Sequence, residues 1–357
     1  MENKKVLVGM SGGVDSAVSA YLLQSGGYSP IGVNCRFFDN GDAFVSDKTC
    51  CSLDDANDAR AVASKLGIPF FVFNMKDDFR VKVIEDFVES YIAGATPNPC
   101  IRCNRFLKFG KLLLRAEELD AGAVATGHYV RLSYDSGSER YLLRKGVDES
   151  KDQSYVLYCL TQAQLAHALF PLGGMKKGEV RELAESLGFI NAKKHESQDI
   201  CFVPDGDYAS FIEKHSGRAF PHGDFVTTDG RVLGEHKGII RYTVGQRRGL
   251  GLALPAPLYV KEKDVQNNRV VLCPNEGLFA RELFADDINL IALRQIDTPL
   301  RVKAKVRYKH AEQWATVTQP EEDLLHIVFD EPQRAFARGQ AVVLYDGDIV
   351  LGGGTIK

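Results

Sequence analysis

A glycine-rich segment near the start of the chain combines residue types that bind phosphate: Gly9-Met10-Ser11-Gly12-Gly13-Val14-Asp15-Ser16. It follows a short apolar run and precedes residues with helical spacing, so it should join a strand to a helix. Glycine lets the backbone approach an anion closely, and a helix N-terminus presents N–H groups with a positive dipole end. Ser11 and Ser16 add hydroxyl donors, and we expect Asp15 to act through Mg²⁺ or by shaping the loop.

The spacing of this segment excludes two common phosphate loops. No Gly-Lys-Ser/Thr follows it, as in a Walker A loop, and the dinucleotide pattern Gly-x-Gly-x-x-Gly is absent. The segment therefore predicts a different kind of phosphate-binding loop. The alternative is an ordinary turn between a strand and a helix.

Two cysteines have sequence surroundings that favour a reactive thiolate. Cys103 lies next to Arg102 and just before a helix expected to begin near Phe106, and Cys201 follows the basic run 193–195. Cations and helix N-termini lower the pKa of a thiol. Two such thiols beside a phosphate loop predict sulfur transfer, in which one carries a persulfide and the other resolves it by exchange. The alternative for each is a buried, unreactive thiol.

Other cysteines have simpler interpretations. Cys50 and Cys51 are adjacent, a spacing that forms a disulfide only with strain, so we expect a pair of loop thiols. Cys159 lies in an apolar run and Cys273 in an expected strand, and both are predicted to pack in the core.

The first part of the chain alternates strands with helices. The expected strands are 6–10, 30–35, 70–73 and 123–126, and the expected helices are 17–23, 54–66, 79–91 and 107–118. This alternation predicts an α/β fold with a doubly wound parallel sheet. Ligands of such sheets bind at the carboxyl ends of the strands.

The pattern changes near residue 205, where short segments lie between glycines and polar turns. From about residue 286 the runs 300–308, 314–317, 324–329, 341–344 and 349–351 predict closely spaced strands, which favour a small β-barrel. We therefore expect three domains: a catalytic domain over 1–204, a small central connecting domain over 205–280, and a C-terminal β-barrel over 281–357.

The composition is typical of a globular chain: of 357 residues, 45% are apolar and 25% are charged. No apolar stretch is long enough to span a membrane, and the first residues lack signal-peptide features, so we expect a cytoplasmic protein with no membrane partner. In that compartment the 8 cysteines should be catalytic, metal-binding or buried rather than a disulfide framework. The net charge of −3 argues against nonspecific coating of nucleic acid but allows a local basic face.

Several motifs together resemble one family. The string Ser-Gly-Gly-x-Asp-Ser resembles the signature of the ATP pyrophosphatases (PP-loop enzymes), which cleave ATP between the α and β phosphates. Over nearly the whole chain, the motifs resemble those of the tRNA-specific 2-thiouridylase family (MnmA/TrmU). They are the PP-loop and the segments 96–99, 125–129, 151–155, 201–202, 245–251 and 352–354.

This resemblance implies a catalytic domain of the adenine nucleotide alpha hydrolase-like type and the reaction of a tRNA uridine 2-sulfurtransferase. ATP would adenylate the C2 oxygen of the wobble uridine (U34), with release of pyrophosphate and then AMP, and sulfur from a cysteine persulfide would give 2-thiouridine. Cys201 would carry the persulfide, Cys103 would be the nucleophile that completes sulfur release, and the two would form a disulfide during turnover. The implied partners are the anticodon stem-loop of tRNA and a sulfur-donor protein, either a cysteine desulfurase or a relay.

Family positions also imply binding residues. Cys35 and Gly127, with the loop 9–16, would contact the adenine nucleotide, and Asn98, Pro99 and Cys100 would surround the target base. The other implied tRNA contacts are His128, Lys151, Asp152, Gln153, Arg307, Tyr308 and Gln340. Their residue types, and the basic stretch Arg241, Arg247 and Arg248, favour contact with phosphates and bases. A solvated charged face is the alternative.

Cys100 departs from the family pattern, because some members carry an acid there with a base-like role. A thiol could take that role only with a lowered pKa. The substitution creates Cys100-x-x-Cys103, and with Cys201 three thiolates could hold a [4Fe–4S] cluster with one iron open to sulfide. Sulfide delivery through such a cluster is the second hypothesis, and a spare thiol beside the nucleophile is the alternative.

Two other functions fit parts of the pattern. A PP-loop ligase or amidotransferase would pass nitrogen, but a glutaminase-type cysteine domain is not apparent. An RNA-binding or sulfur-relay module would use ATP only as a structural ligand. For the sulfurtransferase we expect the segment from Gln198 to Asp205 to be mobile and to order over bound tRNA, because an adenylated site must exclude water.

Overall fold

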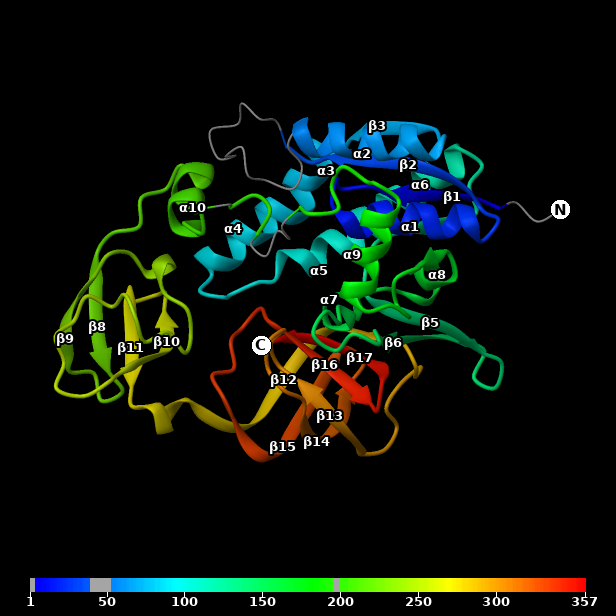
Figure 1. Ribbon diagram of the computed structural model, residues 1–357. Coiled ribbons are helices and arrows are strands. Elements are labelled where there is room, and N and C mark those ends of the chain that lie inside the picture. Colours follow the sequence, from blue (N-terminus) through cyan, green and yellow to red (C-terminus); the bar gives the residue numbers. More distant parts are fainter. Residues whose placement is uncertain (1–3, 39–52, 195–199, 204) are drawn as a thin grey trace.

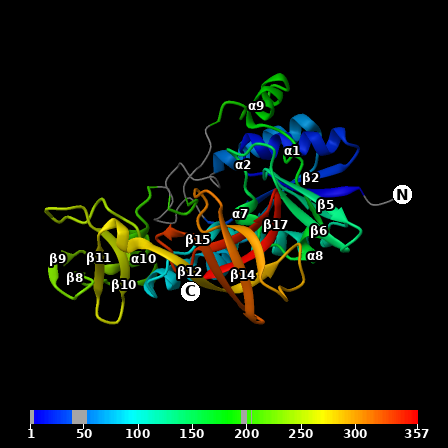
Figure 2. The same ribbon diagram turned by 90° about the horizontal axis from the view of Figure 1, so that it is seen from below.

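The computed structural model describes residues 4–38, 53–194, 200–203 and 205–357. Three parts follow one another along the chain: an α/β layer, a small central part at one end, and a C-terminal barrel below the layer (Figure 1). The view from below again places the central part beside the barrel (Figure 2). None of the helices within these ranges is long and apolar enough to cross a membrane.

A five-stranded parallel sheet forms the centre of the first part, as predicted. Its strands are β1 (Lys5–Gly9), β2 (Ser29–Arg36), β3 (Phe70–Asn74), β4 (Ala123–Ala125) and β7 (Ala168–Leu169), in the spatial order β3-β2-β1-β4-β7. Because β1 is the central strand, the loop that follows it leaves the middle of the sheet's carboxyl edge.

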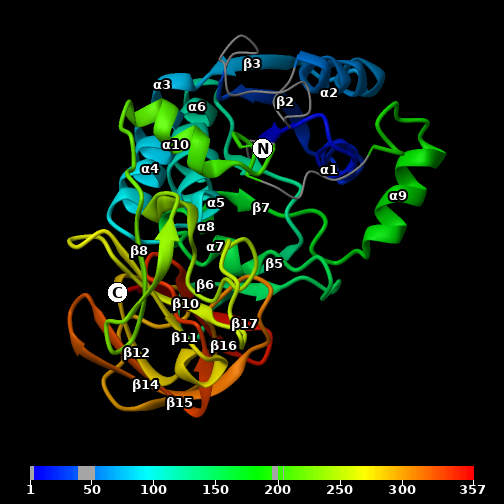
Figure 3. The ribbon, with the colours of Figure 1, turned by 90° about the vertical axis from the view of Figure 1, so that its left-hand side faces the viewer.

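Helices cover both faces of this sheet. They are α1 (Val14–Ser25), α2 (Leu53–Leu66), the run α3 (Lys76–Phe79), η1 (Arg80–Ile84) and α4 (Glu85–Ile92), the run α5 (Pro99–Cys103), η2 (Asn104–Lys111) and α6 (Leu112–Glu118), and then α7 (Ser154–Leu157), α8 (Gln162–Ala166) and α9 (Lys177–Ser186). Val6 and Val8 of β1 pack with α1, α2 and α9, whereas Leu7 packs with helices between residues 76 and 118. The sheet is therefore doubly wound, and α9 lies beside α1 at its margin (Figure 3).

The central part is a small sheet with one helix. Its strands are β8 (Gly223–Thr227), β9 (Val232–His236), β10 (Tyr259–Asp264) and β11 (Arg269–Cys273), in the order β10-β11-β8-β9, with the short turn η3 (Ile239–Arg241). Helix α10 (Tyr208–Ser216) is capped by the Asp207 carboxylate, which accepts the N–H of Ser210, and it ends at Gly217 with a positive φ. Phe211 of α10 packs against Phe87 of α4, so this part is fixed to the α/β layer.

The C-terminal strands close into a barrel, which confirms the predicted architecture. After the turn η4 (Asn275–Leu278) they are β12 (Phe279–Leu290), β13 (Leu300–Lys305), β14 (Gln313–Glu321), β15 (Leu324–Arg334), β16 (Ala341–Asp346) and β17 (Ile349–Ile356). The order is β12-β15-β14-β13-β16-β17, and β17 pairs back to β12. Alternate side chains such as Val302 and Ala304 fill the interior.

An unpredicted hairpin from the first part joins the barrel sheet. Strands β5 (Val130–Asp135) and β6 (Arg140–Lys145) pair with each other, and Arg144 of β6 pairs with Ile349 of β17. Asp348 strengthens the junction, because its carboxylate accepts from Arg131 at 2.7 Å and from Arg144 at 2.9 Å. The α/β layer and the barrel are thus connected by backbone pairing as well as by side chains.

Candidate active site

The glycine-rich loop leaves β1 as predicted and turns directly into α1. Gly12 has a φ of +79°, and a Cβ at this position would lie 2.3 Å from the carbonyl oxygen of Asp55, so only glycine fits. The Ser16 hydroxyl donates to the Gly13 carbonyl at 2.9 Å and accepts the N–H of Ser11 at 3.3 Å. The N-cap residue of α1 is Gly13, which has no side chain to accept the first N–H groups of the helix. The first N–H groups of this helix therefore suit an anion.

Asp15 is held inside this loop by two side chains. The ammonium of Lys177 lies 2.7 and 2.8 Å from its carboxylate oxygens, and the Tyr129 hydroxyl donates to it at 2.7 Å. A Cβ on Gly127 would lie 2.9 Å from the Cβ of Asp15, so glycine is required there for close packing. These contacts favour the loop-shaping role for Asp15 and leave its carboxylate already paired with a cation, which does not fit a Mg²⁺ ligand.

The chain that leads toward Cys201 also contacts the loop. Asn191, which is 2% exposed, donates to the Gly12 carbonyl at 3.0 Å. Lys194 pairs with Asp55 at 2.6 Å and with Asp58 at 2.5 Å. The positive charge of Lys194 is therefore neutralised by two aspartates. Lys194 thus adds little to the electropositive setting predicted for Cys201 from the run 193–195, of which His195 lies outside the described residues.

Cys103 lies inside a helix rather than just before one. The helix begins at Pro99, not near Phe106, because the Asn98 side chain accepts the N–H of Cys100 at 3.1 Å and proline suits the first helical position. Cys103 is the last residue of α5, and the helical run continues into η2. The thiol in the first turn is that of Cys100, which is exposed. The argument from the helix N-terminus therefore applies to Cys100 and not to Cys103.

Three thiols contact the large hydrophobic core that joins the three parts of the chain. Cys103 is buried in this core, and Cys35 and Cys201 are partly buried against it. Burial, with a smaller contribution from the nearby Cys103, raises the pKa of Cys35 to about 12, although Lys108 acts to lower it. Cys35 therefore remains a neutral thiol at physiological pH. Next to Cys201 in the chain, Phe202 packs edge-on against Phe87 with ring centroids 5.2 Å apart. This contact fixes the position of the backbone beside Cys201.

The three thiols proposed as cluster ligands are not assembled around a common point. Among the residues that the structure describes, no group of three His, Cys, Asp or Glu side chains could hold a metal ion. Cys100, Cys103 and Cys201 therefore do not form a ready site for a [4Fe–4S] cluster, and none of the six described cysteines takes part in a disulfide. Cys50 and Cys51, and residues 198, 199 and 204 of the segment expected to be mobile, lie outside the described residues. Cys159 and Cys273 are buried, as expected.

His128 is a core residue instead of a surface contact. It is 8% exposed, its Nδ1 lies 2.7 Å from the Thr126 hydroxyl, and its ring packs near Phe109 and Phe170. Burial, with a contribution from Lys108, lowers its pKa well below 6.5. A neutral, enclosed ring does not fit the solvated loop histidine, and it presents little surface to RNA.

Several other predicted tRNA contacts come together where the α/β layer meets the barrel. The Tyr308 hydroxyl donates to the Asp152 carbonyl at 3.1 Å, and the Gln340 amide donates to the Thr96 carbonyl at 2.6 Å. Gln153 accepts the N–H of Tyr129 at 3.0 Å and so orients the loop that contains Lys151. The two barrel residues thus lie beside the loops 96–100 and 151–153, although they are far apart in sequence.

Two of the predicted basic contacts have internal partners. Arg307 donates to the carbonyls of Val244 and Ala335 at 3.0 and 2.9 Å, and burial lowers its pKa. It braces the central part against the barrel. Arg241 pairs with Glu213 at 2.9 Å. Arg247 and Arg248 are exposed. They are therefore the arginines of the basic stretch that are accessible to a binding partner.

Family models agree with this arrangement of three parts. Family models match the three parts in turn: a tRNA methyl transferase HUP domain over residues 4–205, a tRNA methyl transferase PRC-barrel domain over 209–274 and an aminomethyltransferase beta-barrel domain over 280–356. Among solved structures, a 4-thiouridine synthetase in complex with RNA and bound ATP matches with a TM-score of 0.38 and 18% identity, over 59% of this chain and 50% of that one.

Full-length relatives are much more similar. The chain is 49% identical over 355 residues to the tRNA-specific 2-thiouridylase MnmA of Clostridioides difficile (strain 630), covering 99% of this chain and 98% of the relative. It is 52% identical over 358 residues to MnmA 1 of Thermoanaerobacter sp. (strain X514), covering 100% and 98%. Identity of this extent over the whole length leaves one assignment: the chain belongs to the tRNA-specific 2-thiouridylase (MnmA) family.

Proposed function

We propose that the chain is a cytoplasmic tRNA uridine 2-sulfurtransferase that uses ATP to convert the wobble uridine to 2-thiouridine. The observation that carries this proposal is the phosphate loop that follows the central strand of the parallel sheet, where Gly12 lies against Asp55. Cys103 and Cys201 both contact the large hydrophobic core that joins the three parts of the chain. Membership of the 2-thiouridylase family supports the choice of tRNA uridine as substrate.

The first step is adenylation of the uridine. ATP, carried as its magnesium complex, places its phosphates at the N–H groups of the loop 9–16 and the N-terminus of α1. The C2 oxygen of the uridine attacks the α phosphorus, and pyrophosphate leaves. The C2 oxygen thereby becomes part of a leaving group, AMP. Water must be excluded from this site, because it could displace the AMP in place of sulfur. Backbone N–H groups fixed by Gly12 and Ser16 stabilise the charge that develops on the phosphate oxygens.

The second step replaces oxygen by sulfur. The terminal sulfur of a persulfide on Cys201 attacks C2, AMP leaves with the oxygen, and the base is joined to Cys201 through two sulfur atoms. The Cys103 thiolate then attacks the Cys201 sulfur, which breaks the bond to the transferred sulfur and forms a Cys103–Cys201 disulfide. A dithiol reductant must restore both thiols, and a sulfur-donor protein must reload Cys201. In a variant of this step, Cys103 first releases sulfide, which attacks C2 itself.

Other functions have less support. Sulfide delivery through a [4Fe–4S] cluster would need Cys100, Cys103 and Cys201 to move together, because they do not form a metal site among the residues described. A nitrogen-transferring PP-loop enzyme would not need the two thiols. A sulfur-relay module would not need a phosphate loop whose geometry is enforced at Gly12.

A product analysis tests the proposal. The chain is incubated with unmodified tRNA, a persulfide donor, and ATP labelled separately at the α and γ phosphates. We expect one AMP and one pyrophosphate for each 2-thiouridine detected by nucleoside mass spectrometry. AMP formation without thiolation would favour nitrogen transfer, and thiolation without ATP cleavage would favour a relay. Either outcome would overturn the proposal.

A further inference from the structure

One ion pair at the nucleotide loop involves a lysine that no sequence pattern reveals. Lys177 begins α9, and its ammonium contacts both carboxylate oxygens of Asp15, at 2.7 and 2.8 Å. The side chain of Lys177 is 9% exposed and that of Asp15 is 30% exposed. The lysine is therefore largely shielded from water and the aspartate partly so, which strengthens the interaction between the charges and makes the loss of one partner costly.

Surrounding contacts fix the pair in place. The backbone N–H of Lys177 donates to Asp148 at 2.9 Å, which anchors the start of α9. Tyr129 donates its hydroxyl to the same Asp15 oxygen that lies 2.7 Å from Lys177, and the ammonium lies 5.8 Å from the centre of the tyrosine ring. Gly127 packs closely against the aspartate, because a Cβ on this glycine would lie 2.9 Å from the Cβ of Asp15. Asp15 cannot turn toward the loop without breaking these contacts.

The position of Asp15 explains why its carboxylate needs a bound cation. Asp15 lies in the first turn of α1, whose N-terminus is the part of the loop that suits phosphate. An uncompensated carboxylate there would repel an incoming anion and compete with it for the positive end of the helix dipole. A cation bound to Asp15 removes both effects.

We propose that Lys177 is a positioning residue of the nucleotide site: it neutralises Asp15 and holds it away from the phosphates, so that the loop accepts ATP. Lys177 acts through Asp15 and does not itself contact the nucleotide. This role depends on the proposed function in one respect: it assumes that the bound nucleotide is ATP.

Nucleotide binding tests this role without catalysis. Binding of α,β-methylene-ATP to the full chain is measured by calorimetry, without tRNA or sulfur donor. We expect Lys177→Met to raise Kd roughly 10- to 100-fold, because it leaves a shielded carboxylate uncompensated beside the phosphates. The double variant Lys177→Met with Asp15→Asn should bind within about threefold of wild type, because the charge that needed neutralising is gone. Lys176→Met, at the exposed neighbouring position, is the matched control and should bind like wild type.

Two outcomes would overturn the inference. Unchanged binding by Lys177→Met would show that the pair serves stability alone, and a double variant as weak as Lys177→Met would show that the lysine contacts the nucleotide directly. If Lys177→Met does not fold, the double variant is compared with Asp15→Asn: equal affinity supports the inference, and a tenfold loss overturns it. Because no thiolation is measured, failure of the proposed function would appear separately, as absence of 2-thiouridine from a wild-type chain that binds the nucleotide.

Discussion

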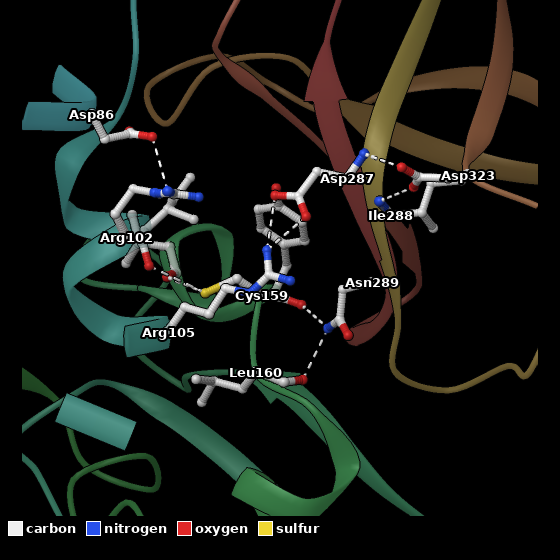
Figure 4. A network of polar contacts seen from close by, with 12 residues as sticks. Asp86, Arg102, Arg105, Cys159, Leu160, Asp287, Ile288, Asn289 and Asp323 are labelled. Carbon is white, nitrogen blue, oxygen red and sulfur yellow. Dashed lines mark hydrogen bonds and ion pairs between the residues drawn. The ribbon is translucent and has the colours of Figure 1, made fainter. Parts of the chain in front are cut away.

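Arg105 donates through one guanidinium nitrogen to both carboxylate oxygens of Asp287, each at 2.8 Å (Figure 4). Arg105 belongs to the helical run that contains Cys103, and Asp287 belongs to β12 of the barrel. Asp287 has a φ of 48° at a shift in the register of β12, where the Asp323 carboxylate accepts the N–H groups of Asp287 and Ile288 at 3.2 and 2.8 Å. The irregular strand therefore directs Asp287 toward the helix and links the barrel to the position of Cys103.

Substitution of Asp287 should loosen this link. Asp287→Asn keeps a residue type that tolerates a positive φ but removes the charge. We expect a loss of about 1 kcal/mol in the free energy of unfolding, since the aspartate is partly exposed, and a severalfold slower formation of 2-thiouridine. Urea unfolding and initial rates measure the two effects. Asp286→Asn is the control, because its partner Lys357 lies 3.7 Å away on the surface, and an equal effect of both variants would contradict the link.

The cysteines should differ sharply in reactivity. Cys100 is exposed, Cys103 is 8% exposed, and burial raises the pKa values of Cys35 and Cys159 to about 12. We expect iodoacetamide at pH 7.5 to modify Cys100 before Cys103 and to leave Cys35 and Cys159 unmodified in the folded chain, since the thiolate is the reactive form. Peptide mass spectrometry over time gives the order, and the urea-unfolded chain, in which all should react alike, is the control. Early modification of Cys35 would contradict the raised pKa of this partly buried thiol.

The contribution of Lys263 to stability should rise with pH above neutrality. This β10 residue donates to the Ala95 carbonyl at 3.1 Å, and burial lowers its pKa from 10.5 to about 8. Between these values the unfolded chain holds a proton that the folded chain lacks, so the free energy of unfolding increases with pH across this window. The full shift corresponds to about 3 kcal/mol.

Unfolding of the Lys263→Met variant isolates this effect. From pH 7.5 to 9.5 wild type should gain up to about 2 kcal/mol relative to Lys263→Met, as measured by urea unfolding. Lys261→Met, at an exposed position of the same strand, should follow wild type. A difference between wild type and Lys263→Met that does not change with pH would show that Lys263 has the same pKa in both states.

The exposed arginines of the central part should contribute to tRNA affinity. We expect the double variant Arg247→Ala and Arg248→Ala to weaken tRNA binding roughly tenfold and to reduce the dependence of log Kd on log salt by about 1 to 2, because each phosphate contact releases counterions. Filter binding at several salt concentrations measures both. Arg231→Ala, an exposed arginine outside this stretch, is the control; an unchanged salt dependence in the double variant would place the tRNA elsewhere.

The parts of the fold predicted from sequence depend on local patterns. Alternating strands and helices predict the doubly wound sheet, and closely spaced strands predict the barrel, because each pattern lies within a short stretch of chain. The hairpin β5–β6 escaped prediction because most of its residues are only partly buried and show no clear alternation. The start of the helix at Pro99 was missed because Thr96-Pro97-Asn98-Pro99 resembles a turn, whereas Asn98 in fact caps the helix.

The candidate site likewise contains features that local sequence predicts and features that depend on contacts between distant elements. The phosphate loop was predictable because its glycines and serines are contiguous. The pairing of Asp15 with Lys177 spans 162 residues, and no local signal connects the two. The burial of His128 likewise depends on Phe109 and Phe170, which come from other elements. Contacts between elements decide which of the predicted polar residues remain available to a ligand.

The role of Cys201 is the central claim, and nucleoside mass spectrometry of tRNA tests it most directly. Wild type and the variant Cys201→Ser are each incubated with tRNA, ATP and a persulfide donor, and tRNA binding is measured in parallel. We predict 2-thiouridine with wild type, none with Cys201→Ser, and tRNA affinities that agree within about twofold, because serine cannot carry a persulfide but keeps the local structure. Full thiolation by Cys201→Ser would contradict the account.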